Sequence, residues 1–133
     1  MPRIERHWEK LSEEKWEHLA VEWLQCIKAK KGDDDEPCNK WWQIIINLGL
    51  WGPPDCLWEF TKLVVSLADD DQLEYIAAGP IEYLLGRAGP EYISVVEVEV
   101  ENNPKLLRAI KHCNQYRMTD EVWTRIQRLQ ARA

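Results

Sequence analysis

The chain has 133 residues, of which 45% are hydrophobic and 30% charged, and these proportions are typical of a single globular domain. The sequence has no run of about 18 apolar residues, the length that a membrane-spanning helix needs. The first eight residues, Met1 to Trp8, mix both charges and lack the apolar stretch of a secretory signal. We therefore expect one soluble domain over residues 1–133, in the cytoplasm and not in a membrane.

The cysteines and histidines indicate neither a metal site nor a cofactor site. Cys26, Cys38, Cys56 and Cys113 are scattered, and none belongs to a C-x-x-C pair. A metal or redox centre is the alternative, but free cysteines usually pack as small hydrophobic residues. We expect four buried thiols, no metal and no cofactor.

The net charge of −6 is unevenly distributed along the chain. The acidic middle segment, residues 69–101, contains nine acidic residues and one basic residue, Arg87. The basic C-terminal segment, residues 105–133, contains seven basic residues and two acidic ones. An acidic surface repels nucleic acid and attracts basic proteins, so a basic protein partner is expected and direct contact with nucleic acid is not.

The first predicted element is an amphipathic helix over residues 12–31. Ser12 suits the N-cap position, acidic residues follow in the first turn, and Gly32 ends the helix. Apolar residues from Trp16 to Ile27 recur at steps of three and four residues. We expect this stripe to be core, with a partner groove or membrane surface as the alternative.

Residues 33–37 are predicted to form a loop, and the apolar run from Trp41 to Leu48 follows it. Three consecutive isoleucines favour a strand by propensity. The length of the run, a possible cap at Asn39 and Gly49 as a stop favour a buried helix, which we expect.

Two further helices are predicted from the prolines and aspartates that start them. The Pro53-Pro54 pair opens a helix that ends near Ala68. Asp70 or Asp71 caps the next, whose apolar period continues through Gly79-Pro80 to the glycines at 86 and 89. Because proline lacks an N–H, we expect a kink there or two short helices.

Local signals conflict over residues 92–101. The alternation of Val and Glu from Val96 to Glu101 is a strand pattern. Pro90 and the spacing of Ile93, Val96 and Val100 favour a helix, which we expect. Asn103 and Thr119 then cap the last two helices.

These elements predict an all-α fold of about seven short antiparallel helices. Short Pro/Gly connections fit a compact orthogonal bundle, and they also fit a short solenoid-like array of helical hairpins.

No group of residues has the spacing of a catalytic centre, so we do not expect an enzyme. A carboxylate pair could be drawn from Glu74, Glu82, Glu97 and Glu99, but nothing in their spacing makes two of them face each other. His112 and Cys113 are adjacent on a helix and point about 100° apart, so they cannot act as a base and its nucleophile.

The acidic middle segment supplies the predicted partner-binding surface. Carboxylates that alternate with tyrosines suit a basic protein surface, because Tyr offers contact area and the acids pair with Arg or Lys. The alternative is that the tyrosines only cover the core edge. The predicted contact residues are Asp70, Asp71, Glu74, Tyr75, Glu82, Tyr83 and Glu97.

A motif in the same segment resembles a bacterial domain family of unknown function. Residues 77–85, AAGPIEYLL, are similar to the family core A-A-G-P-[LI]-E-x-L-L, and a G-x-x-[FY]-I step follows at residues 89–93. A closing V-W-x-R-[IV] helix is matched at residues 122–126. The resemblance covers roughly residues 41–130, implies a helix over 90–102 and brings no known activity.

We therefore predict a non-enzymatic protein-binding module, most plausibly a bacterial immunity protein or antitoxin that neutralises a basic toxin. An acidic mimic of nucleic acid, of the type that phages use as antagonists, is one alternative. A small enzyme of another type and a structural adaptor are the others. Exposed tryptophans would also serve a homodimer.

Overall fold

The computed structural model describes residues 8–32 and 34–133, and these residues form helices and connecting loops without a strand. The all-α prediction is confirmed. The expectations for residues 1–7, including the absence of a secretory signal, lie outside the described residues. None of the helices over the described ranges is both long and apolar enough to cross a bilayer.

Helix α2 (Glu13–Lys28) begins as predicted, since the Ser12 side chain accepts a hydrogen bond from the Lys15 N–H at 3.3 Å. Helix α3 (Glu36–Trp51) begins earlier than predicted. Its cap is Asp35, whose carboxylate accepts from the Cys38 N–H at 3.3 Å, so Asn39 is not the cap. The end of the predicted loop at 33–37 is therefore helical, because Pro37 fits the first turn of a helix.

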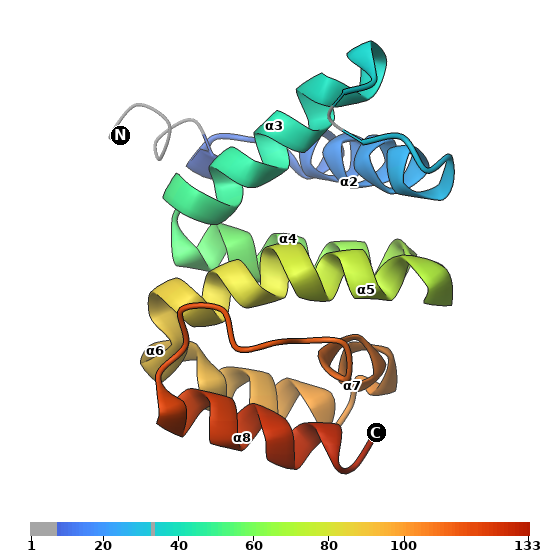
Figure 1. Ribbon diagram of the computed structural model, residues 1–133. Coiled ribbons are helices and arrows are strands. Elements are labelled where there is room, and N and C mark those ends of the chain that lie inside the picture. The colour runs from blue at the N-terminus through green and yellow to red at the C-terminus, as the bar shows by residue number, and fades with distance from the viewer. Residues whose placement is uncertain (1–7, 33) are drawn as a thin grey trace.

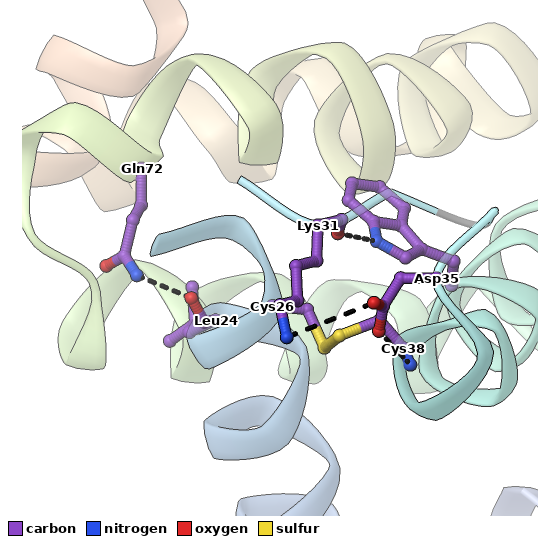
Figure 2. The surroundings of a disulfide bond; sticks show 7 residues. Leu24, Cys26, Lys31, Asp35, Cys38 and Gln72 are labelled. Carbon is purple, nitrogen blue, oxygen red and sulfur yellow. Dashed lines mark hydrogen bonds and ion pairs between the residues drawn. A yellow bond between two sulfur atoms is a disulfide. The ribbon is translucent and has the colours of Figure 1, made fainter. Parts of the chain in front are cut away.

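A disulfide joins the end of α2 to the start of α3, which corrects the prediction of four free thiols. Cys26 and Cys38 are 12 positions apart, and their Cα atoms are 5.9 Å apart. Figure 2 shows the bond beside two further contacts between these helices and their loop: Trp42 donates its indole N–H to the Lys31 carbonyl, and Lys31 pairs with Asp35. Cys56 and Cys113 are free.

Helix α4 (Pro54–Leu67) lies in the middle of the molecule, between the α2–α3 pair and the C-terminal helices (Figure 1). It packs against α2 on one side and against α6 and α7 on the other. Its buried face includes Leu57, Phe60 and Val64, as the apolar period predicts. Burial on both sides makes α4 the central element of a compact bundle.

The Gly79-Pro80 pair does not break the helix in which it lies. A short 3-10 turn (η1, Asp70–Gln72) leads into α5 (Leu73–Ile76), a π-helical turn (η2, Ala77–Ile81) and α6 (Glu82–Val100). The wider π turn accommodates Pro80, whose missing N–H would otherwise interrupt the bond pattern. Asp69 caps this element, with Gln72 accepting from its N–H, so the predicted caps at Asp70 and Asp71 were wrong.

The change of direction lies further on, at Ala88, whose φ of −136° and ψ of 31° are not helical. In Figure 1 the helix crosses the middle of the molecule and then turns towards α8. The valine-rich stretch after this kink is helical, as predicted. Val96 and Val100 are buried, whereas Val98 points outward and is 69% exposed.

Helices α7 (Pro104–Ile110) and α8 (Asp120–Gln130) have the predicted caps, Asn103 and Thr119. Both pack against α6 and against each other. The Gln130 side-chain amide donates to the carbonyls of Ile110 and Cys113, which holds the connecting loop against the end of α8. The C-terminal layer is thus fixed by side-chain bonds as well as by apolar packing.

Candidate functional site

The acidic middle segment does not form one open negative face, because the chain's own cations pair with much of it. Four of its carboxylates form ion pairs within the chain, three of them with arginines of the basic C-terminal segment. The pairs are Lys28–Asp69 at 2.8 Å, Arg108–Asp70 at 3.2 Å, Arg132–Glu101 at 3.0 Å and the close pair Arg125–Glu97. The two oppositely charged segments of the sequence therefore neutralise each other across the packed helices.

Two of the predicted contact residues are turned towards the interior. Glu82 is only 6% exposed and accepts a hydrogen bond from the Asn114 N–H at 2.9 Å, so it offers no carboxylate to a partner. Its burial raises the pKa of the carboxyl group. The half-buried Tyr83 ring covers Gly49 and meets the Tyr116 ring edge-on at 5.8 Å. The position of Tyr83 fits the alternative interpretation, in which its ring covers the edge of the core, better than a role in partner contact.

The remaining predicted residues lie together but are few. Asp71, Glu74 and Tyr75 are exposed on η1 and α5, and Tyr75 is 41% exposed. Asp70 and Glu97 are occupied by Arg108 and Arg125. The segment thus keeps a small polar surface at Asp71, Glu74 and Tyr75, which lies outside the cavities lined by Tyr83 and by Glu91 and Tyr92.

A different group of carboxylates surrounds a cavity of about 430 Å³ between α2 and α4. We call it the acidic pocket. Its volume is within the usual range for ligand sites. The residues that line it are Trp8, Glu9, Glu13, Trp16, Glu17, Asp55, Cys56, Glu59, Phe60 and Leu63. Among these described lining residues five are acidic and none is basic.

The base of the acidic pocket is aromatic. The ring of Trp16 stacks on that of Trp8, with centroids 5.8 Å apart, and tilts against that of Phe60 at 5.9 Å. Trp8 and Phe60 are buried, whereas Trp16 and Leu63 are half-buried and leave apolar surface open to solvent. The negative faces of aromatic rings attract cations, so the base and the acidic rim favour the same sign of charge.

The five rim carboxylates differ in how the chain satisfies them. Asp55 accepts a close hydrogen bond from the Tyr92 hydroxyl, and Glu59 pairs with Lys62 at 2.6 Å. Glu9, Glu13 and Glu17 form no ion pair with any residue that the structure describes. Three of the rim carboxylates, all on the α2 side, therefore face the cavity without a paired cation among the described residues.

The rim also changes the ionisation of its neighbours. Desolvation and the charges of Glu9 and Asp55 raise the pKa of the Cys56 thiol. Desolvation and the hydrogen bond to Asp55 raise the pKa of Tyr92 to about 12. A thiol held protonated is a poor nucleophile, so the surroundings of Cys56 do not activate it.

Helical periodicity explains how two separate stretches of sequence build this site. Glu13 and Glu17 are four residues apart on α2, and Asp55 and Glu59 have the same spacing on α4. Residues four apart share a helix face, and α2 packs directly against α4. The acidic pocket was not predicted from the sequence, because Trp16 was expected to lie in the core. The repeated acid spacing beside an aromatic residue was the available signal.

The other candidates for chemistry are kept apart by the fold. Cys113 is buried, which raises its pKa, while His112 is exposed on the preceding turn. No group of three or more histidines, cysteines and carboxylates with the geometry of a metal site occurs in the ranges 8–32 and 34–133.

Comparison with known protein families gives a match over most of the chain. The model of a family of unknown function (DUF6869) matches residues 28–133. The searches of curated proteins and of solved structures give no match. The matched residues include the α4 wall of the acidic pocket, whereas the α2 wall lies before them.

Proposed function

Because the chain belongs to a family of unknown function, DUF6869, which assigns no activity, we propose its function from the site itself: it is a non-enzymatic module that binds a basic protein through the acidic pocket. The observation that carries the proposal is the ring of five carboxylates around an aromatic base. A concave negative site raises the association rate of a positively charged partner and selects against acidic ones.

The surface used differs from the one expected from the sequence. Four of the nine carboxylates of the acidic middle segment are paired with the chain's own cations, and a partner would have to break those pairs before it could use them. Glu9, Glu13 and Glu17 form no ion pair with a described residue, so a partner that contacts them breaks none of the described pairs. The expected partner is therefore still a basic protein, but the proposed contact surface is the acidic pocket between α2 and α4.

The finer proposal is an immunity protein or antitoxin of a bacterial cell whose pocket covers the cationic site of a toxin. A small, rigid, helical body with a negative concavity suits inhibition by charge and shape complementarity. The mimic of nucleic acid is less favoured, because mimicry needs an extended row of free negative charges, and the longest acidic stretch is paired internally.

The test compares capture of host proteins by the wild type and by variants of the α2 acids. Glu13→Gln with Glu17→Gln removes two rim acids, and Glu14→Gln removes an exposed acid of the same turn that does not line the pocket. We expect the wild type and E14Q to retain the same basic protein and the double variant to lose it, as read by mass spectrometry. Equal capture by all three proteins would contradict the proposal.

The cytoplasmic location remains a proposal, and the Cys26–Cys38 disulfide is the feature that bears on it. Disulfides persist in oxidising compartments and are reduced in most cytoplasms. Trapping thiols at lysis and counting free cysteines in the native protein decides the matter. Four free cysteines support a cytoplasmic location, and two contradict it.

A further inference from the structure

We propose that the acidic pocket is a receptor for a single arginine side chain of the partner, with the guanidinium held between the Trp16 ring and the carboxylates of Glu13 and Glu17. This inference rests on the proposed function and specifies the chemistry that the pocket recognises. It predicts that the pocket prefers arginine to lysine and that binding is more specific than a general attraction between charged surfaces.

Aromatic and acidic groups of α2 meet at the acidic pocket. Trp16 and Glu17 follow Glu13 by three and four residues, so each is a neighbour of Glu13 on the helix surface, and all three residues line the cavity. A guanidinium is planar, stacks on an indole and donates through a rigid fork that matches a carboxylate. A lysine ammonium is compact and strongly hydrated, and it gains less from such a site.

The carboxylates on the α4 wall of the acidic pocket are less available to bind a guanidinium. Asp55 is engaged by the Tyr92 hydroxyl and Glu59 by Lys62. Their charges still repel an anion from the entrance, but a ligand must compete with existing partners to bind them. Among the described residues, the carboxylates without an ion pair are on the α2 side. This places the guanidinium there and leaves Leu63 and Cys56 to contact the aliphatic stem.

The aromatic base of the acidic pocket is formed before any ligand binds. Phe60 is 1% exposed and Trp8 5% exposed, and both support Trp16 through ring contacts. A ring that is already fixed loses little conformational entropy when a ligand stacks on it. The aromatic base is therefore ready to receive a planar cation without rearrangement of the core.

The experiment is a ¹H–¹⁵N NMR titration of the full chain with three small probes. N-acetyl-arginine amide carries the cation, N-acetyl-citrulline amide is its neutral planar counterpart, and N-acetyl-lysine amide carries the other cation. We expect saturable shifts at residues 13–17, at 55–63 and at the Trp16 indole with the arginine probe. Citrulline should give none, and lysine should bind several-fold more weakly. Equal binding of lysine, or of citrulline, overturns the proposal.

Variants locate the binding. Glu13→Gln with Glu17→Gln should weaken the arginine probe by about tenfold, since each half-exposed charge pair contributes up to about a factor of five, and Glu14→Gln should leave it unchanged. Trp16→Leu should also weaken it, with a thermal melt as the check on folding. Unchanged affinity in the double variant overturns the proposal.

Three outcomes separate this inference from its rivals. Arg3 and Arg6 precede Trp8 in the sequence, so the variant Arg3→Gln with Arg6→Gln is titrated as well. If this variant binds the arginine probe more tightly than the wild type, the chain's own arginines compete for the acidic pocket. That result would overturn the assignment of the arginine to a partner. Specific arginine binding without any captured basic protein would contradict the proposed function but not the inference. A captured protein whose binding survives in the presence of excess arginine probe would contradict the inference alone.

Discussion

Glu82 places its carboxylate against the loop that follows α7, where it accepts a hydrogen bond from the Asn114 N–H. Burial disfavours the charged form, and this effect exceeds the stabilisation by that hydrogen bond, so the pKa of Glu82 is raised above its ordinary value of 4.5. A group with a raised pKa in the folded state binds protons more tightly there than in the unfolded chain. Its contribution to stability is therefore greatest in acid and declines as the pH rises through the folded-state pKa.

Replacement of Glu82 tests this. Glu82→Gln keeps an oxygen acceptor for Asn114 and removes the charge, so the stability of the wild type relative to this variant should fall as the pH is raised from about 4 to about 7. Glu82→Ala leaves the Asn114 N–H without its partner and should lose about 1–3 kcal/mol. Urea unfolding at several pH values measures both. If the free energy of unfolding of the wild type instead increased relative to that of E82Q as the pH rises, the raised pKa of Glu82 would be contradicted.

At the scale of elements, three sets of contacts fix the positions of α2 and α3. The disulfide links the last turn of α2 to the first turn of α3, and Gln72 donates from η1 to the Leu24 carbonyl at 2.8 Å, which ties α2 to the centre of the molecule. Arg87 of α6 donates to the carbonyls of Gly49 and Gly52 at 2.7 Å and thereby satisfies the end of α3. The acidic pocket depends on this arrangement, because α2 supplies one wall.

Removal of the disulfide should lower stability without abolishing the fold. Closing a loop of this size restricts the unfolded chain, and the loss for Cys26→Ser with Cys38→Ser is about 2–3 kcal/mol. Urea unfolding measures it under non-reducing conditions. A reductant should destabilise the wild type by a similar amount and leave the double variant unchanged. An equal response of both proteins to the reductant would show that the bond contributes nothing.

At the scale of the whole molecule, the packing of α8 against α6 brings the two charged segments together. The half-buried Arg125 pairs with Glu97 and also donates to the Ser94 hydroxyl at 3.0 Å. The hydrogen bonds from Arg125 lower the pKa of Glu97. A lowered pKa in the folded state contributes stability above the unfolded-state pKa, and this contribution is lost as the pH falls through the folded-state pKa.

Glu97→Gln should therefore cost about 1 kcal/mol at neutral pH and much less in acid, where the wild type has also lost its charge. Glu74→Gln is the matched control, because Glu74 is exposed and forms no ion pair within the described ranges. Thermal unfolding at two pH values distinguishes the variants. A loss that is the same at both pH values would point to packing rather than to the ion pair.

The sequence by itself determined the helices, because their signals are local. Caps at Ser12, Asn103 and Thr119, apolar residues at steps of three and four, and prolines in first turns act within a few residues. The same locality identified the helix over 92–100, where the spacing of Ile93, Val96 and Val100 outweighed the alternation of Val and Glu.

Only the tertiary structure decided which charges remain free and which thiols are joined. Cys26 and Cys38 meet because α3 folds back beside α2, and Glu97 is neutralised because α8 crosses α6. The acidic pocket arises in the same way, from two helix faces that are about 40 positions apart in the sequence. Electrostatic interaction depends on distance in space, and that distance is set by packing rather than by order along the chain.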